Sequence, residues 1–263
     1  MTFGSLFAGI GGFDLGLERA GMLCRWQVEI DPFCRAVLAK HWPEVPRYDD
    51  VRTVGVDTLE RVDVLCGGFP CQDISHAGKR VGMAGERSGL WSEYARLIGE
   101  LRPRYVLVEN VTALLGRGLG AVLGDLAAIG FDAEWDCIPA SAIGAPHRRD
   151  RVWLLAYPNG TRLEGWERAG VSERAHERPF GARGAYVSDT HDQGQSGIAF
   201  HDGARRSLSA FARAHEWWRI EPDVGRVAHG VPNRVDRLRS LGNAIVPQIA
   251  EWIGRRVIAH GAM

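Results

Sequence analysis

Short apolar runs alternate with longer segments of helical spacing over the first 156 residues of the chain. Five runs have the length and composition of strands: Phe3–Phe7, Cys24–Ile30, Asp63–Cys66, Tyr105–Val108 and Val152–Ala156. Helical spacing predicts helices over four stretches: between Gly12 and Ala20, Leu90–Leu101, Leu119–Ile129 and Ala244–Ala259. This alternation is typical of an α/β fold with a mostly parallel sheet.

The pattern changes after residue 156. From there to about residue 206, apolar residues are isolated among Gly, Arg, Glu and His, and regular spacing returns only near Trp217. We therefore expect a domain over 1–156, an irregular region over 157–227, and a segment over 228–263 that returns to the first domain. The irregular region is either a small domain or a mobile insertion that becomes ordered on a partner.

The 263 residues carry no net formal charge, with 32 basic and 32 acidic side chains, but this charge is unevenly distributed. Residues 147–263 hold 18 basic and 13 acidic residues, whereas residues 1–146 hold 14 and 19. The basic excess of the C-terminal part favours a polyanionic partner. Nearly all basic residues are arginine, which suits phosphate and guanine, although a GC-rich coding sequence gives the same excess.

Cysteine content and hydropathy exclude several classes of protein. The five cysteines are odd in number and form no C-x-x-C pair, so neither a disulfide framework nor a metal site is predicted. Four of them are expected to be small buried residues, as free cysteines in a reducing compartment usually are: Cys24, Cys34, Cys66 and Cys137. No basic leader and no apolar run of 18 residues occurs, so we expect no signal peptide and no membrane span.

The residues that bear chemistry begin with a glycine-rich loop, Phe7-Ala8-Gly9-Ile10-Gly11-Gly12, between the first strand and the first helix. Such a turn brings backbone N–H groups close to a ligand. Glu29 lies 17 residues past Gly12, where the next strand ends, and a carboxylate there can accept hydrogen bonds from both hydroxyls of a ribose. The loop and the acid indicate a dinucleotide or S-adenosylmethionine. The F-x-G-x-G-G spacing differs from the G-x-G-x-x-G of dinucleotide sites and favours S-adenosylmethionine.

A second turn, Gly67-Gly68-Phe69-Pro70-Cys71-Gln72, follows the third strand and places Cys71 at a rigid, exposed tip. A thiol with an ordinary pKa is mostly protonated at neutral pH, so a nucleophilic cysteine needs a basic neighbour. Glu109 ends the next strand, where a buried carboxylate is costly unless it has a partner or a role. Because the ends of parallel strands meet at one edge, we expect Gly9, Glu29, Cys71 and Glu109 around one cleft.

Two arginines, Arg149 and Arg151, occupy alternate positions at the start of the last strand of the first domain. Alternate residues of a strand share a face, so both guanidinium groups can point at one anion or carboxylate. A solvated run of charges is the alternative interpretation, because the neighbouring residues are polar as well.

In order and in spacing, these motifs resemble those of the cytosine-5 DNA methyltransferases. The resemblance covers roughly residues 1–156 and 228–263, and its specificity comes from six motifs that occur in the family's order. It implies a Rossmann-like S-adenosylmethionine-dependent methyltransferase domain, together with a small irregular target-recognition domain over 157–227.

On the cofactor side, Ser5–Gly12 resembles the cofactor loop and Glu29 the acid that binds ribose. Asp50-Val51 resembles the pair that contacts adenine, and Gly242-Asn243-Ala244 the late cofactor motif. Ile30 stands where some members of the family stack an aromatic ring on adenine. The cofactor-binding residues implied are Phe7, Gly9, Ile10, Gly12, Glu29, Ile30, Asp50, Val51, Pro70, Leu90, Asn243 and Ala244.

On the catalytic side, Pro70-Cys71-Gln72 resembles the nucleophile loop, Glu109-Asn110-Val111 the segment with the catalytic acid, and Arg149-Asp150-Arg151 the arginine pair. The resemblance implies methyl transfer to carbon 5 of a cytosine flipped out of duplex DNA. The cysteine would add to carbon 6 of the base, and the glutamate would hold a proton at ring nitrogen 3. The second arginine would orient the glutamate or the base, and the first would support the carbonyl side of the cytosine.

The resemblance also implies partners and a setting. The mobile loop Gln72–Gly89 would contact phosphates of double-stranded DNA through Lys79, Arg80 and Arg87. A monomeric modification enzyme in the cytoplasm of a bacterium or a phage-infected host is expected, with a cognate restriction endonuclease as a partner.

Two other functions stay open: methylation of cytosine in RNA, and DNA binding without turnover by a silent relative. The intact set Cys71, Glu109, Arg149 and Arg151 speaks against the second. A Rossmann dehydrogenase is disfavoured by the spacing of the glycine loop.

Overall fold

A computed structural model describes residues 1–70, 89–160, 208, 210–211 and 234–261. Cys71, the rest of the predicted nucleophile loop up to residue 88, and most of the predicted recognition region lie outside the described residues. The expectations that concern them, including the division of the chain into domains, stay predictions.

The described strands form one seven-stranded sheet with the order β3-β2-β1-β4-β5-β7-β6. Their bounds are β1 Thr2–Leu6, β2 Leu23–Val28, β3 Arg47–Tyr48, β4 Val64–Gly67, β5 Tyr105–Val111, β6 Phe131–Pro139 and β7 Asp150–Pro158. Neighbours from β3 through β5 pair in parallel, whereas β7 runs antiparallel to both β5 and β6. The prediction of an α/β fold with a mostly parallel sheet is therefore confirmed.

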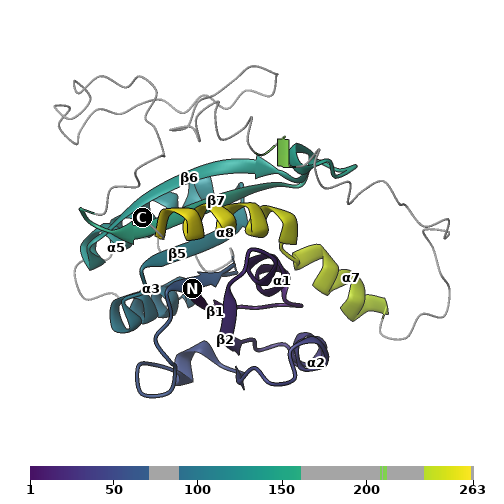
Figure 1. Cartoon of the computed structure of the whole chain (residues 1–263), viewed down its shortest axis with the longest axis horizontal. Helices are drawn as coiled ribbons and strands as arrows, with labels where there is room; N and C mark the ends of the chain where they lie inside the picture. The colour runs from purple at the N-terminus through teal and green to yellow at the C-terminus, as the bar shows by residue number, and fades with distance from the viewer. Residues whose placement is uncertain (71–88, 161–207, 209, 212–233, 262–263) are drawn as a thin grey trace.

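Helices cover both faces of this sheet. Their bounds are α1 Gly12–Arg19, α2 Pro32–His41, α3 Leu90–Leu101, α4 Leu114–Arg117, α5 Leu119–Ile129, α7 Arg234–Asn243 and α8 Pro247–Gly261, with 3₁₀ turns η1 Val51–Thr53 and η3 Ala140–Ile143. Figure 1 shows α1 and α8 packed side by side on one face. Among the residues described, every helix is too short or too polar to cross a lipid bilayer.

Side chains that alternate along the strands form one apolar core on each face of the sheet. Tyr105 and Leu107 of β5 join the apolar cluster that contains the buried residues of α1 and α8. Val106 and Val108 join the cluster that contains those of α3 and α5. Successive strand residues point to opposite faces, so one run of buried β-branched and aromatic residues serves both layers.

The structure confirms some predicted elements and corrects others. Helices over Leu90–Leu101 and Leu119–Ile129 are confirmed to the residue. The last helix begins at Pro247 instead of residue 244, in agreement with the preference of proline for a first helical turn. The longest elements that were not predicted are α2, α7 and the edge strand β6, in which acidic residues interrupt the apolar pattern. The short elements β3, α4, η1 and η3 were not predicted either.

The order of the strands locates the edge at which a ligand would bind. The chain extends the sheet from β1 to β2 and β3 on one side, and then continues with β4 on the other side of β1. In open α/β sheets, ligands bind at the carboxyl ends of strands at such a switch point. Here those ends are Leu6 and Gly67, which precede the two predicted turns.

Candidate active site

A cleft of about 590 Å³ opens at this edge of the sheet, a size that suits a small-molecule cofactor. It is lined by the segments that follow β1, β2 and β4, by the end of β5, and by residues of η1, α2, α3, β7 and α7. Of the predicted cofactor residues, nine line it: Phe7, Gly9, Glu29, Ile30, Asp50, Val51, Pro70, Leu90 and Asn243. Ile10, Gly12 and Ala244 are not among its lining residues.

The loop after β1 takes a conformation that glycine favours. Gly9 has a φ of 56°, and its N–H donates to the Glu29 carboxylate at 2.7 Å. Phe7, which lines the cleft, also has a positive φ of 52°, an uncommon backbone conformation for a residue with a side chain. Gly12, a predicted cofactor residue, also has a role in packing. A Cβ there would lie 2.6 Å from the carbonyl oxygen of Ile245. Glycine therefore permits α1 to pack closely against the segment just before α8.

Glu29 follows β2 and is nearly buried, with 9% of its surface exposed. One carboxylate oxygen accepts the N–H of Gly9 at 2.7 Å, and the other accepts the N–H of Asp31 at 2.8 Å. A carboxylate oxygen can accept more than one hydrogen bond, so each retains capacity for a donor from the cleft. Glu29 is thus held in place by backbone donors while it lines the cavity.

Glu109 and Arg151 form an ion pair across two antiparallel strands. In the register of β5 and β7, Arg151 lies opposite Val111, two residues from Glu109 on the same face. Arg151 Nε lies 3.1 Å from Glu109 Oε1. Burial raises the pKa of Glu109 to about 7, although the charges of Arg151 and Arg149 act in the opposite direction. The carboxyl group therefore exchanges a proton near neutral pH.

Two further contacts bring the segment before Cys71 close to Glu109. A Cβ on Gly68 would lie 3.2 Å from Glu109 Oε2, so a side chain there would crowd the carboxylate. The amide of Asn110 donates to the carbonyl oxygen of Phe69 at 2.9 Å. Asn110 is 4% exposed, and this hydrogen bond satisfies a side-chain amide that is otherwise buried in the strand. The turn that leads to the predicted nucleophile is thus fastened to β5.

Arg149 and Arg151, which we expected could point at one anion or carboxylate, have different hydrogen-bonding partners, although the charges of both act on Glu109. The strand β7 begins at Asp150, and Arg149 precedes it with a φ of 41°, outside the pleat. Its guanidinium donates to the carbonyl oxygens of Gly242, at 2.9 Å, and Ala244. Arg149 therefore fixes the junction between α7 and α8, whereas Arg151 holds Glu109.

Sequence reasoning missed part of the cleft wall that α2 and α7 provide. Asp31, Cys34, Arg239 and Ser240 line the cavity, and the thiol of Cys34 lies 3.5 Å from the hydroxyl of Ser240. The sequence contains a signal for the start of α2, because Asp31 is a typical N-cap residue and a proline follows it. Buried free thiols are confirmed at Cys24, Cys34 and Cys66, whereas Cys137 is only half-buried on β6.

Comparison with known proteins gives a consistent result. The model of the family described as C-5 cytosine-specific DNA methylase matches residues 1–202. The Type II methyltransferase M2.BsuMI of Bacillus subtilis (strain 168) is 29% identical over 299 residues, which cover 96% of this chain and 74% of that protein. The Type II methyltransferase M.HhaI of Haemophilus parahaemolyticus is 30% identical over 171 residues, which cover 64% of this chain and about half, 52%, of that protein.

Among solved structures, a prophage-encoded DNA modification methyltransferase of E. coli has the same fold. It superposes with a TM-score of 0.61 and covers 100% of both chains at 17% sequence identity.

Proposed function

This chain belongs to the C-5 cytosine-specific DNA methylase family, which methylates carbon 5 of cytosine in DNA with S-adenosylmethionine, and we propose that its cleft binds that cofactor beside a flipped cytosine. Glu29 would accept hydrogen bonds from the two ribose hydroxyls, because it lines the cavity and each of its oxygens accepts only one backbone N–H. The turn at Asp50 and Val51 would receive the adenine, and Asn243 would contact the amino-acid end of the cofactor.

The reaction would follow from the residues on the other side of the cleft. Cys71 as thiolate would add to carbon 6 of the cytosine, forming a C–S bond and making carbon 5 nucleophilic. Glu109 would supply a proton at ring nitrogen 3, which neutralises the charge created by the addition. The bound cofactor would supply the methyl group that carbon 5 accepts, with its sulfonium S–CH₃ bond broken and the neutral thioether left as product. Loss of the carbon-5 proton to a base then returns an electron pair to the ring, and the C–S bond breaks to release Cys71.

One observation carries this assignment. Glu109 is buried at the cleft, in contact with Arg151, and has a pKa raised to about 7. A carboxyl group with this pKa is about half protonated at neutral pH, so a substantial fraction can donate to ring nitrogen 3. Arg151 orients this group and, by keeping the pKa from rising further, allows the proton to leave again.

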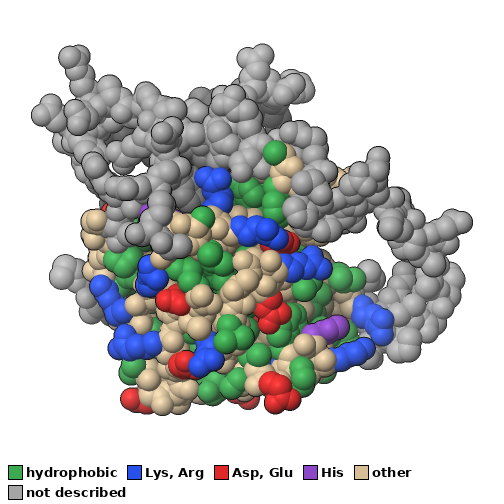
Figure 2. All heavy atoms as spheres, viewed as in Figure 1, with side chains coloured by type: hydrophobic (Ala, Val, Ile, Leu, Met, Phe, Trp, Pro, Cys, Tyr) green, Lys and Arg blue, Asp and Glu red, His purple; other side chains and the backbone are tan. Residues whose placement is uncertain are grey.

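Duplex DNA is the proposed substrate, with base recognition by the region 157–227. Ten of the 18 basic residues in 147–263 lie outside the described part of the chain. On the described surface in Figure 2, basic and acidic side chains are interspersed. We propose a monomer in the cytoplasm of a bacterium or phage-infected host, with a cognate restriction endonuclease, since the relatives reported above include bacterial Type II methyltransferases.

The test uses tritium-labelled S-adenosylmethionine and duplex DNA that contains either cytosine or 5-fluorocytosine. Fluorine at carbon 5 blocks the final elimination, so the enzyme is expected to remain covalently bound to its target. Cys71→Ser should abolish both the adduct and methyl transfer, and should leave cofactor binding nearly unchanged. Transfer to structured RNA in place of DNA would establish the RNA alternative, and cofactor binding without transfer to either would indicate a silent relative.

A further inference from the structure

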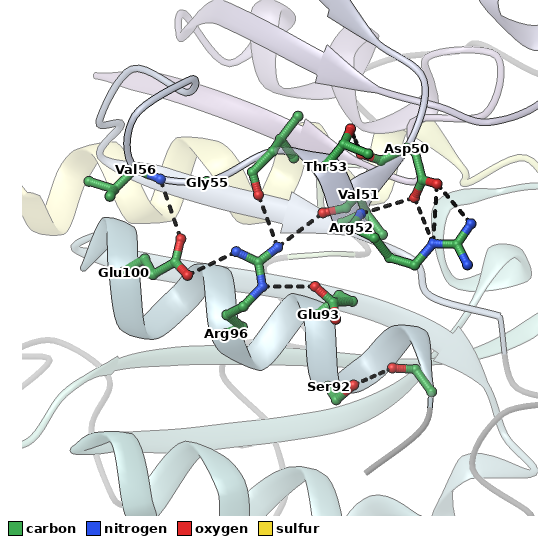
Figure 3. A network of polar contacts seen from close by, with 12 residues as sticks. Asp50, Val51, Arg52, Thr53, Gly55, Val56, Ser92, Glu93, Arg96 and Glu100 are labelled. Carbon is green, nitrogen blue, oxygen red and sulfur yellow. Dashed lines mark hydrogen bonds and ion pairs between the residues drawn. The ribbon is translucent and has the colours of Figure 1, made fainter. Parts of the chain in front are cut away.

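Arg96 joins two parts of the cleft wall without lining the cleft itself. It lies in the middle of α3, and its guanidinium donates to Glu93 at 2.8 Å and to Glu100 at 2.9 Å on the same helix. The other terminal nitrogen donates to the carbonyl oxygens of Val51, at 3.1 Å, and Val54, at 2.9 Å. Figure 3 shows this arginine between the helix and the turn.

The end of a short 3₁₀ turn leaves carbonyl oxygens without helical partners, and Arg96 supplies donors to two of them. The side chains of Val51 and Val54 are 4% exposed and pack in the cluster that includes α3. Charge-assisted hydrogen bonds from Arg96 satisfy their carbonyl oxygens. Glu100 adds a contact through its second oxygen, which accepts the N–H of Val56 at 3.3 Å.

Both fastened elements contribute to the cleft. The turn supplies Asp50, Val51 and Arg52, where the side chain of Asp50 accepts the N–H of Arg52 at 3.0 Å. The helix supplies Leu90 at its first position, directly after the predicted nucleophile loop. The guanidinium of Arg96, which does not line the cleft, therefore links the turn with the predicted adenine contacts to α3, the helix that follows the predicted nucleophile loop.

We propose that Arg96 is a positioning residue that holds the 50–54 turn in the conformation that receives the adenosine end of S-adenosylmethionine. The inference rests on the proposed cofactor site. Without Arg96, the turn would occupy the binding conformation only part of the time, and the apparent Kd would rise by the reciprocal of that fraction. Lysine would replace the arginine only in part, since one ammonium group does not reproduce a planar fork with two carbonyl and two carboxylate partners.

The experiment measures binding and turnover on the full chain. For Arg96→Ala we expect the Kd of S-adenosylmethionine to rise about tenfold, the result of a binding conformation populated one-tenth of the time. The Kd of 5′-methylthioadenosine, which lacks the amino-acid portion, should rise by the same factor. The kcat on DNA at saturating cofactor should stay within about twofold of wild type, because the chemistry lies on the other side of the cleft. Arg96→Lys should give an intermediate Kd.

Two matched variants separate positioning from loss of stability. Glu93→Gln removes one ion pair of Arg96 and leaves the contacts to the turn, so its Kd should equal that of wild type. Arg25→Ala removes a surface pair with Glu60 away from the cleft and reports the effect of destabilisation alone.

Unchanged Kd values in Arg96→Ala, or in Arg96→Lys if the alanine variant does not fold, would overturn the proposal. So would equal weakening in Arg25→Ala. Failure of the wild-type protein to bind S-adenosylmethionine would instead overturn the proposed function on which the inference rests.

Discussion

The two sides of the cleft each place one glutamate near the end of a buried strand, with similar exposure of 9% at Glu29 and 7% at Glu109. On the side formed by β1 and β2, both carboxylate oxygens of Glu29 accept backbone N–H groups. On the side formed by β5 and β7, Glu109 contacts a single guanidinium, and burial raises its pKa to about 7. Similar exposure thus goes with two backbone donors at Glu29, which fix an acceptor, and with an ion pair at Glu109, whose raised pKa makes it a proton carrier.

Substitution by glutamine is expected to impair catalysis at Glu109 and cofactor binding at Glu29. At Glu109 the shape and one acceptor for Arg151 remain, but the exchangeable proton is lost. Glu109→Gln should therefore lower methyl transfer by about a hundredfold to ten-thousandfold, the usual contribution of a positioned general acid. The Kd of S-adenosylmethionine should stay within about twofold of wild type. Steady-state kinetics on duplex DNA with a parallel binding titration checks this, and unimpaired turnover would remove Glu109 as the acid.

The same variant tests the titration itself. The folded-state pKa of Glu109, about 7, lies above the ordinary value of 4.5, so between these values the folded protein keeps a proton that the unfolded chain has lost. The stabilisation is fully present below pH 4.5 and is lost as the pH rises through 7. The free energy of unfolding of wild type relative to Glu109→Gln should fall by on the order of 3 kcal/mol over this interval. Urea unfolding at several pH values measures it, and a constant difference would contradict the raised pKa.

At Glu29 the proposed function depends on hydrogen-bond acceptors, so glutamine should weaken cofactor binding because it has fewer of them. Its amide has one acceptor oxygen, whereas Gly9 and Asp31 present two N–H donors, so one donor would face an NH₂ group. We expect Glu29→Gln to raise the Kd of S-adenosylmethionine about tenfold and to leave kcat at saturating cofactor near wild type. Glu60→Gln, which removes an exposed carboxylate away from the cleft, is the matched control. A Kd equal to that of the control would refute the ribose assignment.

The sequence predicted the elements whose residues face the core. In α3, Tyr94, Leu97 and Leu101 are fully buried, and their spacing gave the helix its pattern. The helix α7 has no comparable face, because Val235 and Leu241 are 78% and 61% exposed. The cofactor loop, Glu29 and Glu109 were predictable for a related reason, since each follows or ends a buried strand of a parallel sheet.

What the local residue pattern left open depends on features that are not local. The contact between Glu109 and Arg151 depends on the register of β5 with an antiparallel strand some 40 residues further along the chain. The divergence of Arg149 from Arg151 depends on a single positive φ just before β7, in a residue with no special preference for it. Gly12 matches the cofactor motif, yet its contact with Ile245 becomes visible only when the two ends of the chain are brought together.

The smallest expected effect is an increase in affinity for the cofactor, on the side of the cleft formed by β1 and β2. Ile30 follows Glu29, lines the cleft and is 66% exposed, so it offers the cofactor an aliphatic surface. An indole ring at this position would stack on adenine over a larger area, and Ile30→Trp should lower the Kd of S-adenosylmethionine about twofold to fivefold. Leu23→Trp is the control, since Leu23 is 54% exposed at the opposite end of β2.

The gain should appear in binding alone, because Ile30 lies on the side of the cleft that carries no proton transfer. A kcat at saturating cofactor that changes together with the Kd would mean that the two sides are coupled, and that the division between a binding side and a proton-transfer side is too simple. An unchanged kcat with a lower Kd would support the separation at the position where the sequence departs from the aromatic residue of other family members.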